Sequence, residues 1–212
     1  MRPTETAIST DVRTRLRSMI LGGELSPGQR IVEDELCERL GAGRTPVREA
    51  LLLMQGEGYL TRKRGWVVQQ VVRSQIGAIF ESRAAVEGAT ARLAARRITK
   101  AELAELAALI EQMQPADSLT RHELNRLNGI FHQRIVDTAA NPLLAQFHDR
   151  TQFQYWMLRV PVLFAEQEMR QSNEQHRLIL AALTAGDEDA AERAARQHAE
   201  TTRAIVEPAL HL

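Results

Sequence analysis

Residues 41–60 read GAGRTPVREALLLMQGEGYL, and this stretch decides how the first third of the chain folds. Glycines at its start favour a sharp turn, and Pro46 suits the first turn of a helix, where its missing N–H is not needed. Two further glycines, at positions 56 and 58, end the helix. Between them, apolar side chains recur at helical spacing and give one buried face. These side chains are Val47, Ala50, Leu51 and Met54.

The beginning of this predicted helix carries two guanidinium groups and a hydroxyl. Arg44, Thr45 and Arg48 lie near its N-terminus and off its apolar face. Side chains placed in this way on a recognition helix reach base edges and phosphates in the major groove of DNA. Two arginines in a first helical turn are also common as solvated surface charge. The neighbouring elements have to decide between these interpretations.

The neighbouring segments favour DNA binding. Residues 33–40 are predicted to form a short helix that ends at Gly41, so the two helices read as a helix–turn–helix. Two strands are predicted at residues 59–61 and 66–71, and the basic turn Arg62-Lys63-Arg64-Gly65 joins them. A basic hairpin beside a helix–turn–helix is typical of a wing that lies along the phosphate backbone.

Composition limits the class of protein. The chain has 212 residues, of which 44% are hydrophobic, and this suits one or two domains with buried cores. The net charge is zero, but residues 1–74 hold 12 basic and 9 acidic side chains, so the basic excess lies in the predicted DNA-binding part. The single cysteine, Cys37, excludes an internal disulfide. No apolar run reaches membrane-spanning length and no signal-peptide core is present, so we expect a cytoplasmic protein without a membrane partner.

From residue 75 onward the sequence predicts helices and no strands. A capping box opens one of them at Thr99, and Asn141-Pro142 opens another. We therefore expect a mainly α protein, with a winged helix–turn–helix in residues 1–72 and an all-helical bundle in residues 75–212. The six expected helices span about 75–97, 99–114, 120–139, 141–159, 165–184 and 187–205.

The spacing of three histidines in this bundle indicates a metal site. Asn128 and His132 are four residues apart, so they project from one face of a helix. His176 and His198 each lie 11 residues from Asp187, in the turn between the last two helices, and would stand at the same height in an antiparallel hairpin. If the third helix packs on that hairpin, the four side chains converge and suit a divalent transition metal, with Zn²⁺ first and Ni²⁺ or Mn²⁺ as alternatives. Spacing alone leaves open that these histidines are structural.

The N-terminal motifs resemble the winged-helix domain of the GntR family of bacterial transcription regulators. The resemblance implies that Arg44 and Arg48 contact bases or phosphates of a double-stranded operator. It also implies that Thr45, Arg64 and Gly65 contact the DNA backbone or the minor groove. The matching segments are PGQRI at 27–31, LCERLG at 36–41, RTPVREAL at 44–51 and GEGYLTRKRG at 56–65.

The helical part resembles the FCD ligand-binding domain of the FadR-type branch of that family, and its six helices favour the shorter VanR-like subgroup. The resemblance implies that Arg83 points inward and holds the carboxylate of a small effector. A surface ion pair between Arg83 and Glu87 is the alternative. The matching segments are ESRAAVE at 81–87, NGIFH at 128–132, NPLL at 141–144 and EQHR at 174–177. The implied metal ligands are Asn128, His132, His176 and His198.

The sequence therefore predicts a metabolite-responsive transcription regulator and not an enzyme. A homodimer would bind a pseudo-palindromic operator, and a small organic acid at the metal site would change the affinity for DNA. A three-histidine, metal-dependent hydrolase and a purely structural helical module are the alternatives. No carboxylate near the histidines stands out in the sequence as a general base, which speaks against the hydrolase.

Overall fold

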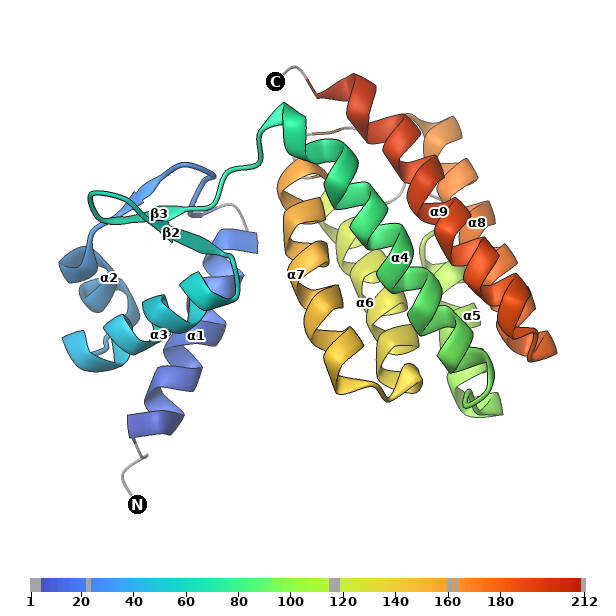
Figure 1. The fold of residues 1–212 in the computed structure, drawn as a ribbon, viewed down its shortest axis with the longest axis horizontal. Helices are drawn as coiled ribbons and strands as arrows, with labels where there is room; N and C mark the ends of the chain where they lie inside the picture. Colours follow the sequence, from blue (N-terminus) through green and yellow to red (C-terminus); the bar gives the residue numbers. More distant parts are fainter. Residues whose placement is uncertain (1–4, 22–23, 115–118, 160–161, 163, 211–212) are drawn as a thin grey trace. The chain divides into compact units, whose positions relative to one another are not determined.

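The computed structural model of the chain describes residues 5–21, 24–114, 119–159, 162 and 164–210. The chain divides into two compact units, Met1–Val72 and Arg73–Leu212, and each is described by itself. Within the described residues, three helices and a small sheet form the first unit, and helices form the second (Figure 1). This architecture confirms the predicted fold class.

The first unit is a winged helix–turn–helix. Its three strands form an antiparallel sheet in the order β1-β3-β2, with Thr61 and Arg30 both opposite Val67. The sequence predicted the strands of the wing but missed β1, which has only two residues and gives no alternating pattern. The elements are α1 (Glu5–Leu21), β1 (Arg30–Ile31), α2 (Glu33–Leu40), α3 (Arg44–Gly56), β2 (Leu60–Arg62) and β3 (Trp66–Val68).

The apolar face of α3 forms the centre of the first unit. Leu51 and Met54 have no exposed surface, and α3 packs on α1, which buries Leu16. Burial of a side chain of this size stabilises a fold by about 1.5–3 kcal/mol. Gly41 ends α2 in the left-handed conformation, at a φ of 62°, and so turns the chain towards α3. The buried face of α3 therefore leaves Arg44 and Arg48, near its N-terminus, on the exposed side of the helix.

Six α-helices form the second unit within the residues that the structure describes. They confirm the predicted number and order of helices, and their ends differ from the predicted ends by a few residues. Asp187 caps the last helix, because its side chain accepts a hydrogen bond from the backbone N–H of Ala190 at 2.9 Å. The helices are α4 (Ile76–Ala95), α5 (Lys100–Gln112), α6 (Arg121–Ala139), α7 (Pro142–Arg159), α8 (Glu166–Ala185) and α9 (Glu188–Ala209), preceded by the 3₁₀ turn η1 (Arg73–Gln75).

Helix α4 is the central element of this bundle and contacts α6, α7, α8 and α9 (Figure 1). Small residues allow the close approach of α4 and α9. A Cβ atom added to Gly88 would lie 2.9 Å from Cγ of Arg196, and Ala91 and Ala191 are fully buried. Side chains on the facing sides of α4 and α9 therefore lie close to each other.

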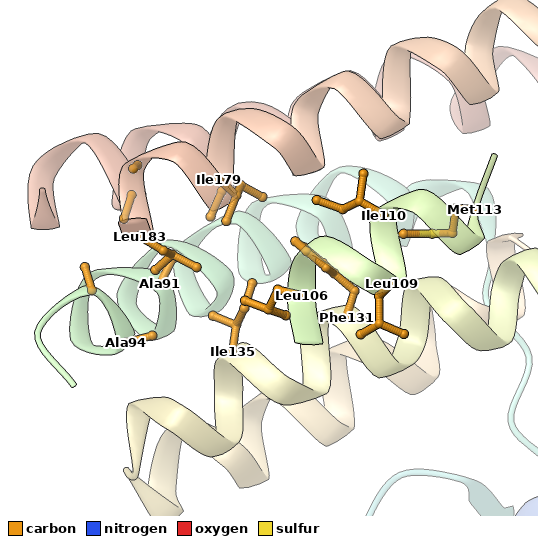
Figure 2. Packing of buried hydrophobic residues seen from close by; sticks show 14 of the residues in the cluster. Ala91, Ala94, Leu106, Leu109, Ile110, Met113, Phe131, Ile135, Ile179 and Leu183 are labelled. Carbon is orange, nitrogen blue, oxygen red and sulfur yellow. The ribbon is translucent and has the colours of Figure 1, made fainter. Parts of the chain in front are cut away.

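A hydrophobic cluster joins α4, α5, α6, α8 and α9 (Figure 2). Phe131 of α6 is fully buried in it, as are Leu106, Ile110 and Ile179. Because Phe131 anchors α6, the next residue, His132, is turned towards the middle of the bundle. Within the described residues, none of the helices combines the length and apolar character that crossing a bilayer requires.

Candidate nucleic-acid interface and metal centre

The N-terminal end of α3 presents its basic side chains to solvent. Arg44, Thr45 and Arg48 are exposed, and the two arginine side chains keep 71% and 63% of their accessible surface. Nε of Arg44 donates to Asp34 at 3.0 Å, and Nε of Arg48 donates to Glu33 at 2.6 Å. Exposed ion pairs contribute little to stability, so nucleic-acid phosphates or bases can replace these carboxylates.

The basic turn between β2 and β3 is held in place by Arg30. Nη2 of Arg30 donates to the carbonyl of Arg64 at 2.9 Å, and its guanidinium packs over Gly65. Gly65 has a φ of 138°, which other residues rarely adopt, and an added Cβ would lie 3.2 Å from Nε of Arg30. Arg62, Lys63 and Arg64 are exposed. The turn can therefore lie along a phosphate backbone.

Glu33 links the base of this turn to the N-terminal end of α3, and the sequence analysis did not predict this role. Its carboxylate accepts from Arg48 and also from the indole N–H of Trp66, at 3.0 Å. These two hydrogen bonds, that from Arg48 first, lower the pKa of Glu33. The base of the wing and the N-terminus of α3 therefore share one carboxylate.

The structure brings three of the predicted metal ligands together in the second unit. His132 of α6, His176 of α8 and His198 of α9 are all buried, with at most 3% of their surface exposed. The centroids of their rings lie 4.6–5.4 Å apart, and one potential ligand atom from each lies within 4.8 Å of the others. Three imidazoles at this range can bind one divalent transition metal.

Each imidazole of this triad has one ring nitrogen beside a polar side chain and one without a partner. The unpartnered atoms are Nε2 of His132, Nε2 of His176 and Nδ1 of His198, all inaccessible to solvent. Buried polar atoms are nearly always paired, so three such atoms in one place indicate a shared partner. The polar neighbours are Oε2 of Glu87 at 3.6 Å from His132 Nδ1, Oδ1 of Asn173 at 3.3 Å from His176 Nδ1, and Nη2 of Arg83 at 3.3 Å from His198 Nε2.

Burial keeps all three imidazoles neutral. Desolvation is the main cause that lowers the pKa of His176 to about 3, and the positive charge of Arg83 adds to it. The pKa values of His132 and His198 are also well below the usual value, because of burial first and then of neighbouring histidines and Arg83. A neutral imidazole has a free lone pair, which is the form that binds a metal.

The metal-free protein should lose stability as the pH falls below about 6.5. Unfolded histidines titrate near 6.5, whereas the folded triad titrates lower, so below that pH the unfolded state binds more protons. Each histidine should then lower the free energy of unfolding by about 1.4 kcal/mol per pH unit. Urea unfolding between pH 7.5 and 5.5 measures this slope. In His176→Gln the change of the free energy of unfolding with pH should be smaller by the contribution of one histidine. An equal slope in the wild type and the variant would contradict the prediction.

Arg83 points into the bundle, and its partner Glu87 is buried with it. Only 1% of Arg83 and 4% of Glu87 are exposed, and Nε of Arg83 donates to Oε1 of Glu87 at 2.5 Å. The guanidinium carbon lies 3.8 Å from the ring centroid of Tyr155, and Nη1 has no hydrogen-bond partner. The pair at i and i+4 therefore exists, but it is not the surface pair of the alternative interpretation. Nη1 of Arg83 is therefore available to donate to a ligand.

A recess in the second unit reaches His176. Asn128 is half-buried and shares this recess with Tyr155 and His176. The fourth predicted ligand therefore lines the recess together with His176, whereas His132 and His198 are not among its lining residues. The other lining residues are Met113, Leu124, Asn125, Phe164, Met169, Ser172 and Asn173.

The sequence analysis did not identify Glu87, whose carboxylate lies beside His132. The sequence held a signal for it: Glu87 is surrounded by small apolar residues of the helix-forming stretch 84–95, which predicts an inward face. Asn173 was also missed. It lies three residues before His176 and so on the same side of α8.

Comparisons with known proteins match both units. Residues 8–68 match the family model described as "Bacterial regulatory proteins, gntR family", and residues 78–201 match the "FCD domain" model. The Nta operon transcriptional regulator of Aminobacter aminovorans is 30% identical over 177 residues, which cover 81% of each chain. The galactonate operon transcriptional repressor of Escherichia coli (strain K12) is 28% identical over 216 residues, 91% of this chain and 94% of that protein.

A solved structure shares the fold over nearly the whole chain. The structure of E. coli McbR/YncC has a TM-score of 0.82 and 27% sequence identity, and it covers 94% of this chain and 96% of that chain. The curated McbR sequence is 29% identical over 192 residues. The relatives compared here are named as transcription regulators.

Proposed function

This chain belongs to the GntR family of bacterial transcription regulators, with a DNA-binding helix–turn–helix domain followed by an FCD ligand-binding domain, and from this premise we propose that a metal-dependent organic-acid signal controls its binding to an operator. The observation that carries this proposal is the triad of buried imidazoles, each with an unpartnered nitrogen. In this proposal, residues 1–72 form the DNA-binding domain and residues 75–212 form the domain that binds the metal and the effector.

The DNA-binding part acts as a homodimer. Two α3 helices enter successive major grooves of a pseudo-palindromic operator, about 34 Å apart. Arg44 and Arg48 contact bases or phosphates, which their exposure supports. Thr45, Arg64 and Gly65 contact the backbone or the minor groove.

The metal centre uses the three histidines, with Asn128 as the oxygen donor from the recess wall. All four ligands are neutral, and Zn²⁺ suits them best, with Ni²⁺ or Mn²⁺ as alternatives. When bound, the cation would offer an open coordination position to the carboxylate of an effector. The imidazoles need no deprotonation to bind, because their burial already keeps them neutral.

The effector is a small organic acid with hydroxyl groups. Nη1 of Arg83, which has no partner, donates to its carboxylate. The amides of Asn125 and Asn128 and the hydroxyl of Ser172 line the recess and suit hydroxyl groups. One relative is named for a galactonate operon, and galactonate is an acid of this kind.

Arg83 also couples the effector to the metal. A guanidinium only donates hydrogen bonds, so its contact with Nε2 of His198 occupies the lone pair of that nitrogen. With Arg83 in this place the proton of neutral His198 is on Nδ1, so His198 can ligate a cation, through either ring nitrogen, only when Arg83 turns away. A carboxylate that accepts from Arg83 makes this easier, so effector and cation favour each other's binding. The bound state then shifts the population of conformations that bind DNA.

The two alternatives have less support. The relatives are named as transcription regulators and not as enzymes, and Glu87, the carboxylate beside His132, is buried and paired with Arg83 through Oε1. A purely structural module would not leave three buried nitrogens unpaired in one place.

The test starts from a duplex that the full-length protein selects out of a random DNA library. Its dissociation constant is then measured with zinc-loaded and with chelator-treated protein, in the presence of D-galactonate, L-lactate or acetate. We expect a hydroxy acid to change the affinity of the zinc-loaded protein by about fivefold or more, the lower range of allosteric coupling, and to leave the chelated protein unaffected. Failure to enrich any sequence, or equal responses with and without zinc, would contradict the proposal.

A further inference from the structure

One oxygen of Glu87 is not explained by its pairing with Arg83. Oε1 accepts from Nε of Arg83, whereas Oε2 is buried and has no hydrogen-bond partner. It lies 3.6 Å from Nδ1 of His132, somewhat beyond hydrogen-bonding distance. A buried carboxylate oxygen needs a donor, and the imidazole is in reach of a small side-chain adjustment.

The position of this oxygen decides which ring nitrogen of His132 carries the proton. A neutral imidazole has one N–H and one lone pair. Oε2 attracts an N–H at Nδ1 and repels a lone pair there. The lone pair of His132 must then be on Nε2, which is the atom without a partner.

The same arrangement occurs at His176, where the orientation of the partner is fixed. The Nδ2 group of Asn173 donates to the carbonyl of Ile110 at 3.4 Å, so its Oδ1 faces Nδ1 of His176 as an acceptor. Nε2 of His176 therefore carries a lone pair as well. Acceptors from α4 and α8 thus face Nδ1 of His132 and of His176, and in both rings the lone pair is left on Nε2.

We propose that Glu87 is a positioning residue of the metal centre, which holds His132 as the Nδ1–H tautomer and so directs its Nε2 lone pair at the cation. The inference rests on the metal centre proposed above. Carboxylates behind metal-binding histidines are general in metalloproteins, and their loss weakens metal binding about 10- to 100-fold.

Glu87→Gln tests the role with little change in shape. The glutamine oxygen can still accept from Arg83, but its NH₂ group then faces Nδ1 of His132. This group donates to Nδ1 and favours the opposite tautomer, with the proton on Nε2. Glu81→Gln is the matched control, because Glu81 is on the same helix, 76% exposed, and loses the same charge.

The tautomer is read in the metal-free proteins by ¹⁵N NMR of the imidazoles, with His132→Gln to assign the resonances. We expect Nδ1–H in the wild type and in Glu87→Gln a change to Nε2–H. Zinc affinity, measured by competition with a chromogenic chelator, should fall at least tenfold in Glu87→Gln and stay within about threefold of wild type in Glu81→Gln. The spectroscopic result separates positioning from a general effect of charge.

The same His132 tautomer in wild type and Glu87→Gln would overturn the inference, as would equal zinc affinities of Glu87→Gln and Glu81→Gln. Both results leave the metal centre in place, since the wild type still binds zinc. A different result, no zinc uptake by the wild-type protein, would overturn the proposed metal centre itself. The role of Glu87 in directing a lone pair at a cation would then fail with it.

Discussion

Replacing His176 by alanine is expected to remove most of the metal from zinc-loaded protein. Four-ligand zinc sites have apparent binding free energies of roughly 10–16 kcal/mol, so one ligand accounts for about a quarter. Its loss should weaken zinc binding by about two to three orders of magnitude. His176 is buried in the triad and its lowered pKa keeps it neutral, so its unpartnered Nε2 is available to a cation at neutral pH.

The measurement is elemental analysis after zinc loading and exhaustive dialysis. His176→Gln should lose the same amount of zinc. Glutamine is closer than alanine to histidine in volume, so this variant controls for the cavity that alanine leaves. Glu174→Ala is the control, since Glu174 is exposed on the same helix two residues away and should leave the zinc content at the wild-type value. Equal zinc content in all of these proteins would rule out the triad as a metal site.

Replacing Arg48 or Arg44 by alanine is expected to weaken binding to the selected operator duplex by roughly 5- to 150-fold each. This is the range for the loss of a good contact between an arginine and a base. The side chains are exposed at the start of α3, and their partners in the free protein, Glu33 and Asp34, can be displaced by DNA. Metal content should be unchanged, because the substitutions lie in the other domain.

The matched control is Arg13→Ala. Arg13 belongs to the same domain and its pairing with Glu57 is of comparable kind, so the variant removes the same charge. Fluorescence anisotropy at two salt concentrations also separates the roles: loss of a phosphate contact lowers the salt dependence by about one unit, whereas loss of a base contact lowers sequence preference. Equal losses in all three variants would mean a general charge effect, and undiminished affinity would disprove the recognition-helix assignment.

Much of the first unit could be predicted because its signals are local. The apolar spacing of Val47, Leu51 and Met54 defines the buried face of α3, and this alone places Arg44 and Arg48 on the outside. A glycine in the left-handed conformation and a proline in the first turn set the ends of the helices. Strand β1 was missed, since two residues become a strand only through pairing with β3.

The triad was partly predictable from the sequence. His176 and His198 lie at equal distances from the turn at Asp187, so the spacing predicted that they would face each other, and the structure places their ring centroids 4.6 Å apart. His132 depended on the assumption that α6 packs on that hairpin. This packing is decided by Phe131 and the apolar cluster around it, which no single periodic pattern contains.

The sequence by itself determined which elements form, where most of them end and which face of each is buried, because capping, turn geometry and periodicity act over a few neighbouring residues. Only the tertiary structure decided what the buried polar atoms touch. The neighbours of the three imidazoles are Glu87, Arg83 and Asn173, and the first two lie more than 40 residues before His132 in the sequence. Such contacts depend on how closely α4 approaches α6 and α9, and that distance follows from the volumes of all the side chains packed between them.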